Sequence, residues 1–215
     1  MQYHYVFFDL DGTLLDTLDD LQDSVNTILS KHSLPPITSY EAAHILGNGA
    51  KHLVHCSLKD QVPPEKEEEI LNEYKAWYQD HCRIKTAPYP GVMELLSSLK
   101  AAGCLTAVVS NKPDPAVREL NTYFFGDLVE VAIGEKKEIR RKPAPDMLLE
   151  AMRLLEAERE ECVYVGDTEV DLQTAANAGL RCISVAWGFR SVEELNTAGA
   201  ETIVSTASEL ENCIL

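Results

Sequence analysis

The sequence predicts an α/β fold, in which a Rossmann-like parallel sheet with helices on both faces carries an inserted α-helical bundle. Two observations predict it. From about residue 88 onward, short apolar segments alternate with amphipathic helical segments, which is typical of a parallel sheet with right-handed crossovers. Between residues 17 and 85 only helical periodicity is found. The expected division is therefore a core domain of residues 1–16 and 86–215 and a helical cap domain of residues 17–85.

The first expected strand ends in two acidic residues. An apolar run over residues 6–8 is typical of a strand buried on both faces. Asp9 follows directly, and Asp11 begins an Asp-Gly turn. The alternative is a hairpin after an edge strand, but the apolar residues after Gly12 recur at helical spacing. Ligands of open α/β sheets bind beyond the carboxyl ends of strands. Two close carboxylates repel each other, which indicates either a metal ion or a shared proton.

The insertion is expected to form four helices, over residues 18–31, 40–46, 50–58 and 65–81. The last one is amphipathic, with its apolar and aromatic residues along one stripe. Because the insertion leaves and re-enters the core at the strand end that carries Asp9, it is expected to cover a site there like a lid.

The remainder of the chain is expected to supply the other strands and helices of the sheet. Further strands are expected over residues 105–109, 128–133, 163–165, 182–186 and 202–204. Helices are expected over residues 91–102 and 115–123, over 145–155, and from the Gly166-Asp167 turn to residue 178. Gly103 and Gly179 are placed to end two of these helices as C-terminal caps.

The composition excludes several classes of partner. A formal net charge of −16 argues against nucleic acid, which requires clustered Lys and Arg, and against anionic lipid surfaces. One locally positive pocket would still suffice for a small phosphorylated ligand. The start of the chain does not resemble a signal peptide, and no stretch approaches membrane-spanning length. Six cysteines without metal-ligand spacing favour a reducing, cytoplasmic location.

Polar residues follow the expected strand ends in four places. They are the pair Asp9 and Asp11, the run Ser110-Asn111-Lys112, Lys142 before a helix, and Asp167 with Asp171. Simpler interpretations exist for the last three. Ser110 can cap the next helix, and Asp167 and Asp171 can cap theirs, although capping does not require both. Lys142 lies in a basic run, and local sequence does not distinguish it from Arg140 or Arg141.

The four motifs, in this order, resemble those of the haloacid dehalogenase superfamily, in its phosphatase branch with a helical cap inserted after the first motif. The resemblance covers essentially the whole chain. Within the superfamily, residues 9–17 and the segment 46–50 (Leu-Gly-Asn-Gly-Ala) are most similar to phosphoglycolate phosphatases. The Pro-x-Pro after Lys142 also matches the family motif and favours Lys142 over the two arginines.

The resemblance implies roles for the acidic residues. Asp9 would be the nucleophile that forms an aspartyl-phosphate, and Asp11 would protonate the leaving oxygen and then deprotonate the attacking water. Mg²⁺ would be bound by the Asp9 carboxylate, the Asp11 backbone carbonyl and Asp167. Asp171 would support this metal site, either as a ligand or through water.

The resemblance also implies residues that bind the phosphate and the substrate. Ser110 and Lys142 would hold the non-transferred phosphoryl oxygens, assisted by Asn111 and by backbone N–H groups of the first loop around Gly12. Thr13 would stabilise that loop, with helix capping as an equal alternative. Gly47 and Gly49 would let the cap backbone approach a substrate carboxylate, or form an ordinary turn between helices.

The expected function is a Mg²⁺-dependent phosphomonoester hydrolase that acts on a small phosphorylated metabolite, with 2-phosphoglycolate as the best single substrate. A β-phosphoglucomutase-like mutase would share all four motifs. A dehalogenase is disfavoured because Asp11 is present. The alternative from another class is a non-catalytic phosphate-binding regulatory protein. A monomer or a homodimer is expected.

Overall fold

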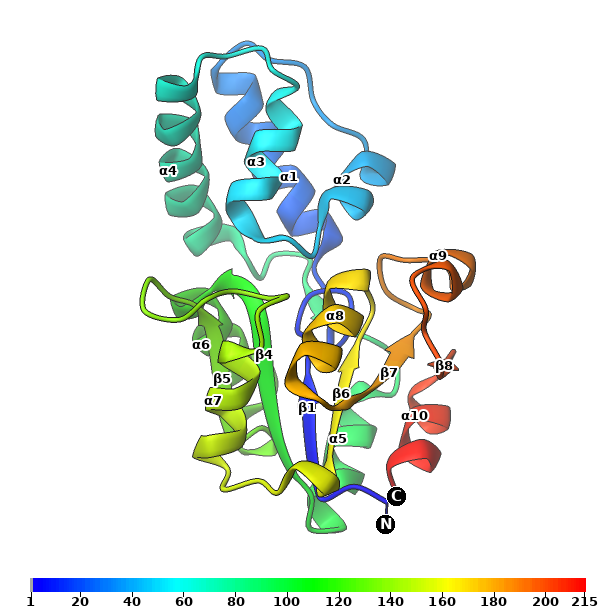
Figure 1. The fold of residues 1–215 in the computed structure, drawn as a ribbon. Helices are drawn as coiled ribbons and strands as arrows, with labels where there is room; N and C mark the ends of the chain where they lie inside the picture. Colours follow the sequence, from blue (N-terminus) through cyan, green and yellow to red (C-terminus); the bar gives the residue numbers. More distant parts are fainter. Residues whose placement is uncertain (1) are drawn as a thin grey trace.

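A six-stranded sheet forms the centre of the computed structural model, which describes residues 2–215 (Figure 1). All its strands are parallel, in the order β5-β4-β1-β6-β7-β8. The strands are β1 (Tyr5–Phe8), β4 (Leu105–Pro113), β5 (Val131–Glu135), β6 (Cys162–Gly166), β7 (Arg181–Val185) and β8 (Ile203–Val204). The expected parallel α/β architecture is confirmed.

Helices cover both faces of this sheet, because its central strands alternate apolar residues between two cores. Val6 and Phe8 belong to one apolar cluster and Phe7 to the other, and all three are fully buried. The first cluster includes side chains of α5 (Val92–Ala101), α6 (Asp114–Phe124) and α10 (Ala207–Ile214), and the second includes those of α7 (Asp146–Leu154) and α8 (Glu169–Ala178). The short helix α9 (Val192–Thr197) follows β7.

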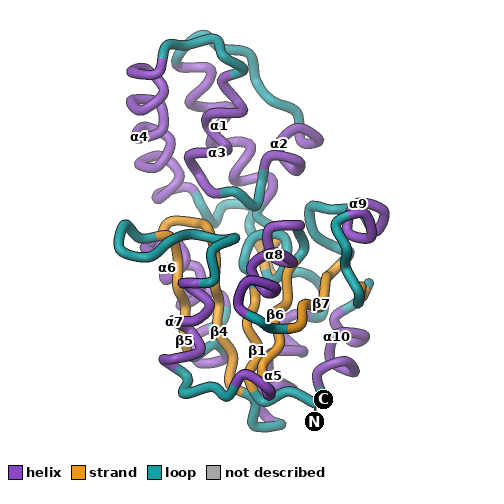
Figure 2. Tube along the Cα trace, viewed as in Figure 1, coloured by secondary structure: helices purple, strands orange, loops and turns teal. Residues whose placement is uncertain are grey.

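Four helices pack on one another beyond the carboxyl end of the sheet, and we call them the helical region (Figures 1 and 2). They are α1 (Leu18–Lys31), α2 (Ser39–Ile45), α3 (Gly49–Leu58) and α4 (Pro64–His81). The buried stripe of α4 consists of Ile70, Leu71, Tyr74 and Tyr78. The four expected helices are confirmed, with boundaries that differ by at most one residue.

Two connections join the helical region to the sheet, and they pair with each other. β2 (Leu15–Asp16) and β3 (Ala87–Pro88) form a short antiparallel ladder. Beside it the buried carboxylate of Asp20 accepts hydrogen bonds from the backbone N–H groups of residues 84–86, at 2.8–3.0 Å, and from the Thr86 hydroxyl at 2.7 Å. One carboxylate at the start of α1 therefore fixes the returning connection.

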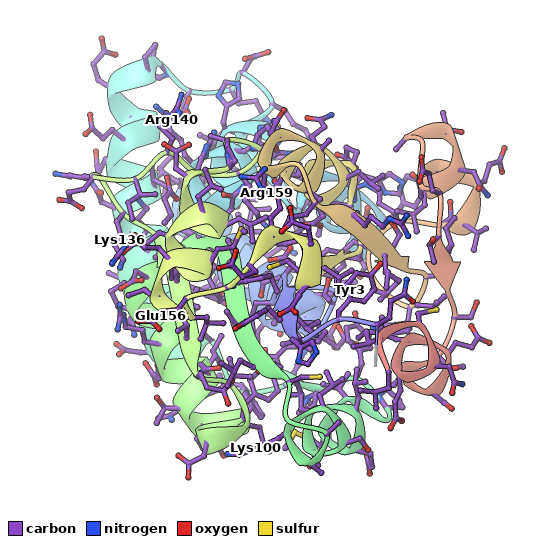
Figure 3. All side chains as sticks on the ribbon, turned by 60° about the horizontal axis from the view of Figure 1, so that its bottom comes forward. Tyr3, Lys100, Lys136, Arg140, Glu156 and Arg159 are labelled. Carbon is purple, nitrogen blue, oxygen red and sulfur yellow. The ribbon has the colours of Figure 1, made fainter. Side chains whose placement is uncertain are left out.

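Several element boundaries differ from the sequence-based expectation. β4 extends to Pro113 rather than ending at residue 109, and β5 begins at Val131, after a 3₁₀ turn over Gly126–Leu128. The pair β2 and β3 and the helices α9 and α10 were not predicted. A second 3₁₀ turn, Arg159–Glu161, precedes β6. Its Arg159, labelled in Figure 3, donates to the carbonyl of Ala178 at the end of α8, where a cation complements the helix dipole.

Candidate active site

A buried lysine connects two carboxylates at the carboxyl end of the sheet. The Nζ atom of Lys142 lies 2.9 Å from Oδ1 of Asp9 and 2.8 Å from Oδ1 of Asp171. The Tyr164 hydroxyl lies 3.0 Å from the same Nζ. Burial alone would lower the pKa of Lys142, but Asp171 and Asp9 raise it above its ordinary value. Lys142 is therefore held as a cation between β1 and α8.

The structure distinguishes Lys142 from its two basic neighbours. Arg140 is exposed and pairs with Asp146 at 2.8 Å. Arg141 donates to the backbone carbonyl of Asn48 in the helical region at 3.0 Å. Of this basic run, Lys142 is the residue that reaches Asp9.

Asp171 has both of its carboxylate oxygens occupied. Its Oδ1 accepts from Lys142 and from the Tyr164 hydroxyl. Its Oδ2 accepts from the backbone N–H of Thr168 at 3.1 Å and from the Thr168 hydroxyl at 2.7 Å, in a capping box at the start of α8. Asp171 therefore caps α8 with one oxygen and contacts Lys142 with the other, so its capping role is compatible with the expected site role.

Asp167 is fully buried and is oriented by two donors. The Thr13 hydroxyl donates to its Oδ1 at 2.9 Å, and the backbone N–H of Phe189 donates to its Oδ2 at 2.8 Å. Thr13 thus links the first loop to Asp167, a partner that neither proposed role for Thr13 had identified.

Two glycines make room for this carboxylate. Gly12 has a φ of +81°, and a Cβ there would lie 2.3 Å from Oδ2 of Asp167. A Cβ at Gly188 would lie 2.4 Å from the same oxygen. The Gly12 N–H donates to the Leu15 carbonyl at 2.9 Å, so the observed contribution of Gly12 is steric. Only a residue without a side chain fits against Asp167 at these two positions.

Three carboxylates form a buried acidic cluster. Asp9, Asp167 and Asp171 each offer an oxygen, and these atoms lie within 4.8 Å of one another. Burial raises the pKa of Asp9 to about 7, opposed by the neighbouring Lys142, and burial together with Asp171 and Asp9 raises the pKa of Asp167 well above its ordinary range. A cation among these oxygens would relieve both shifts. An all-oxygen donor set of this kind suits a hard divalent cation.

Asp11 has a partner that was not predicted from the sequence. Its Oδ1 lies 2.7 Å from Nζ of Lys112, which is buried on β4. The same Nζ lies 4.7 Å from the ring centroid of Tyr78 on α4. The sequence showed Lys112 beside Ser110 and Asn111 but gave it no role, because its partners are distant in the chain.

Ser110 and Asn111 lie on β4 beside this ion pair. The Ser110 hydroxyl oxygen accepts from the backbone N–H of Lys112 at 3.2 Å, which leaves its own hydrogen free to donate. Nδ2 of Asn111 donates to the carbonyls of Gly47 and Lys142, both at 3.0 Å. Its Oδ1 is buried and has no hydrogen-bond partner among residues 2–215. Asn111 therefore connects the sheet to the helical region.

A cavity of about 350 Å³ separates the sheet from the helical region. It is lined on the sheet side by Asp9, Asp11, Ser110, Asn111, Lys112, Pro113, Pro115 and Ala116, and on the helical side by Leu21, Leu46, Gly47, Gly49, Ala50, Leu53, Tyr74, Lys75, Ala76, Tyr78 and Gln79. Its volume falls in the range of small-molecule sites. The expected nucleophile, the expected acid–base residue and both expected cap glycines thus face one cavity.

The segment between α2 and α3 lies against the sheet through its backbone carbonyls. Gly47 and Gly49 have φ values of +107° and +78°. Besides the bonds from Asn111 and Arg141, the buried Arg190 donates to the carbonyls of Ala43 at 2.7 Å and Leu46 at 3.2 Å. Arg190 was not predicted, because its backbone acceptors carry no side-chain signal in the sequence.

Comparison with known proteins agrees with this geometry. Residues 6–185 match the family model described as haloacid dehalogenase-like hydrolase. The N-acetylmuramic acid 6-phosphate phosphatase of Pseudomonas aeruginosa is 30% identical over 98% of this chain and 94% of its own length. The phosphoglycolate phosphatase of Colwellia psychrerythraea is 32% identical over 95% and 94%, respectively.

A solved structure shows the same fold over the full length. A protein from Lactobacillus delbrueckii subsp. bulgaricus, provisionally named a phosphoglycolate phosphatase, superposes with a TM-score of 0.94 and 38% identity, covering 100% of this chain and 99% of that one. The expected superfamily is confirmed, and the relatives support the expected phosphatase activity. The chain belongs to the haloacid dehalogenase-like hydrolase family.

Proposed function

We propose that this protein is a Mg²⁺-dependent phosphomonoester hydrolase that works through an aspartyl-phosphate on Asp9. The observation that carries the proposal is the position of Asp9, which is bonded to Lys142 on one side and faces the cavity on the other. Oδ1 of Asp9 accepts from Lys142 and from the Leu10 N–H at 2.7 Å, whereas Oδ2 makes no hydrogen bond within residues 2–215. One oxygen is therefore held while the other is available.

In the proposed reaction, an Asp9 carboxylate oxygen attacks phosphorus and forms a new P–O bond. The ester P–O bond breaks, and the leaving alkoxide takes a proton from Asp11. A water molecule that gives its proton to Asp11 then attacks phosphorus, which releases inorganic phosphate and restores Asp9. Lys142 and the free Ser110 hydroxyl hydrogen would neutralise the charge on the non-transferred oxygens. Lys142 also opposes the rise in the pKa of Asp9 that burial causes, which favours the ionised form needed for the attack.

Asp9, Asp167 and the Asp11 backbone carbonyl would hold the metal. The buried oxygens and the close fit of Gly12 and Gly188 around Asp167 support this assignment. Asp171 would support the site through Lys142 and Thr168, since both of its oxygens already accept hydrogen bonds. When bound, Mg²⁺ would offset the repulsion between Asp9 and a phosphate dianion.

The helical region is proposed to act as a cap domain of residues 17–85 on a core of residues 1–16 and 86–215. The paired connections β2 and β3 support this division.

2-Phosphoglycolate is the preferred substrate, with N-acetylmuramic acid 6-phosphate as the second candidate because of the 30% identical relative that acts on it. Both are phosphate esters that carry a carboxylate.

No helix within residues 2–215 is long and apolar enough to span a membrane. A cytoplasmic location as a monomer or homodimer is proposed, in line with six free cysteines.

The test is phosphate release from p-nitrophenyl phosphate and from a panel of metabolite phosphates, with and without Mg²⁺. Asp9→Asn should abolish release and leave the thermal unfolding transition in place, while Asp16→Asn, at an exposed position nearby, should behave as wild type. The panel identifies the substrate by kcat/KM. A wild-type protein that is inert with Mg²⁺ across the whole panel would overturn the proposal.

A further inference from the structure

The proposed chemistry leaves some polar groups of the cavity unused. Lys112 and Tyr78 line it, and are 4% and 3% exposed. The Tyr78 hydroxyl is buried and has no hydrogen-bond partner among residues 2–215. Buried polar groups without a partner are rare in folded proteins. Because Tyr78 lines the cavity, its unpartnered hydroxyl is a candidate donor to a bound ligand.

The Lys112 ammonium lies beside this hydroxyl-bearing side chain. Nζ carries three N–H donors, and within residues 2–215 it has one carboxylate partner, Oδ1 of Asp11 at 2.7 Å. The 4.7 Å contact between Nζ and the Tyr78 ring brings a cation of the sheet side next to a tyrosine of the helical side, whose hydroxyl has no partner among residues 2–215. Lys112 thus retains donors for a second acceptor next to Tyr78.

The rest of the helical wall excludes many other ligands. Besides its two tyrosines, the helical side carries two polar side chains, Lys75 and Gln79; of the described residues, no Asp, Glu, Arg or His of the helical region lines the cavity, and most of that wall is Leu, Ala and Gly. The N-terminus of α3 also faces the cavity at Gly49 and Ala50, and Asn48 provides it with no side-chain cap. Uncapped N–H groups at a helix start favour an anion.

We propose that Lys112 and Tyr78 form a subsite for a carboxylate on the alcohol half of the phosphate ester, and that this subsite determines which esters are hydrolysed. The proposal rests on the phosphatase function proposed above. The carboxylate accepts from Nζ of Lys112 and from the Tyr78 hydroxyl, while the phosphoryl group faces Asp9. Because Lys112 also contacts Asp11, the subsite places the ester oxygen close to the acid–base residue.

The test compares 2-phosphoglycolate with 2-hydroxyethyl phosphate, its counterpart of equal length without a carboxylate. The quantity measured is the ratio of their kcat/KM values, so a general loss of activity cancels. Lys112→Met should lower this ratio by about 10- to 100-fold, the range for a hydrogen bond to a charged group, and Tyr78→Phe by about tenfold. Lys66→Met, at a half-buried position on the same helix as Tyr78 and away from the cavity lining, and Tyr40→Phe should leave the ratio unchanged.

Binding provides a readout that does not depend on turnover. In the Asp9→Asn background, calorimetry should show that Lys112→Met weakens the binding of 2-phosphoglycolate by the same factor. The affinity for 2-hydroxyethyl phosphate should change by no more than about twofold. Equal ratios in wild type, Lys112→Met and Tyr78→Phe, with p-nitrophenyl phosphate still hydrolysed, would overturn the subsite and leave the phosphatase proposal standing. Failure to hydrolyse any phosphomonoester, together with carboxylate-selective binding, would overturn the phosphatase proposal alone.

Discussion

The two walls of the cavity differ in charge and in how fully their polar groups are bonded. On the sheet side, Asp9 lines the cavity, and it belongs to a buried charged group with Asp167, Asp171 and Lys142, each of which holds defined hydrogen-bond partners. The exception on this side is Oδ1 of Asn111, which has no partner among residues 2–215. On the helical side the wall is mostly apolar, and the Tyr78 hydroxyl lacks a partner. A bonded, charged wall is organised before a ligand arrives, whereas an incompletely bonded wall is completed by one. The difference indicates that the sheet side carries out the reaction, whereas the helical side determines which substrate binds.

The largest effect should follow from removing the cation of the sheet side. Lys142→Met leaves Asp9 and Asp171 without their shared partner, which costs about 3–5 kcal/mol of stability for a buried pair. It should also lower kcat by about 10²–10³-fold, as for the loss of one charged donor at the phosphoryl group. Thermal unfolding and steady-state kinetics check both effects.

Arg141→Met is the matched control for Lys142→Met. Arg141 is the adjacent cation in the chain, but its side chain is exposed and donates to the Asn48 carbonyl of the helical region. Its loss should leave kcat for p-nitrophenyl phosphate within about threefold, as expected for a rim contact. Equal losses of kcat in the two variants would mean that the basic run contributes as a whole and that Lys142 has no separate role at the phosphoryl group.

The next effect should come from adding a methyl group between the first loop and Asp167. Gly12→Ala places a Cβ 2.3 Å from Oδ2 of Asp167 at a φ of +81°, so the carboxylate must move. Mg²⁺ affinity should fall by about 10–100-fold, the usual effect of disturbing a residue that orients a ligand. Calorimetric titration of Mg²⁺ measures it. Gly103→Ala, at a positive φ with open space, is the control for backbone strain alone.

A smaller effect on catalysis is expected where the helical region joins the sheet. Asp20→Ala removes the acceptor for three backbone N–H groups and one hydroxyl, and should cost about 2–4 kcal/mol of unfolding free energy. The folded fraction should still hydrolyse p-nitrophenyl phosphate with nearly the wild-type kcat. Denaturant unfolding and active-site-normalised kinetics test this. Asp19→Ala, at an exposed position, should change neither the unfolding free energy nor kcat. A large loss of kcat in Asp20→Ala would mean that the chemistry of the sheet side depends on how the helical region is attached.

The smallest effect concerns the pKa values of two carboxylates, one on the sheet side and one in the helical region, which are shifted in opposite directions. Burial raises the pKa of Asp9 to about 7. In the helical region, hydrogen bonds from Lys59 and Thr38 lower the pKa of Glu41 from its usual 4.5 to about 2. A lowered pKa stabilises the fold above the unfolded value, and this contribution is lost as the pH falls from 4.5 to 2.

Nuclear magnetic resonance titration of Glu41 tests that sign. The Glu41 carboxylate should titrate near pH 2 in the wild type. In Lys59→Met its pKa should lie closer to the usual value, because the hydrogen bond from Lys59 is the largest cause of the lowering. Lys66→Met, which removes a lysine that pairs with Glu69 instead, should leave the pKa of Glu41 unchanged. Titration of Glu41 above 4.5 in the wild type would contradict the assigned hydrogen bonds.

Much of the fold could be predicted because its signals are local. α1 begins at Leu18 and ends at Lys31 as expected, since its apolar residues repeat over four turns. β2 and β3 were missed because two-residue strands show no period, and α9 and α10 were missed as well. β4 was expected to end too early, since Ser110, Asn111 and Lys112 are polar but buried against the site.

The candidate site was predictable where a strand end carries the signal. Asp9, Asp167 and Lys142 come together as the resemblance implied. Lys112 and Arg190 were not recognised, because their partners lie 101 and about 145 residues away in the chain. The same limit applies to Tyr164, which follows a pattern of buried strand residues and reveals its hydroxyl partner only in three dimensions.

The most direct test of the central claim is a burst experiment on Asp11→Asn with p-nitrophenyl phosphate. Nitrophenolate leaves without a proton, so Asp9 should still be phosphorylated, while the second step lacks its base. The prediction is one nitrophenolate per enzyme released rapidly, slow turnover afterwards, and a phosphoryl group on the peptide that contains Asp9 after acid quench. Linear release from the first turnover, with no phosphoryl group on that peptide at any quench time, would contradict the assignment of Asp9 as the nucleophile.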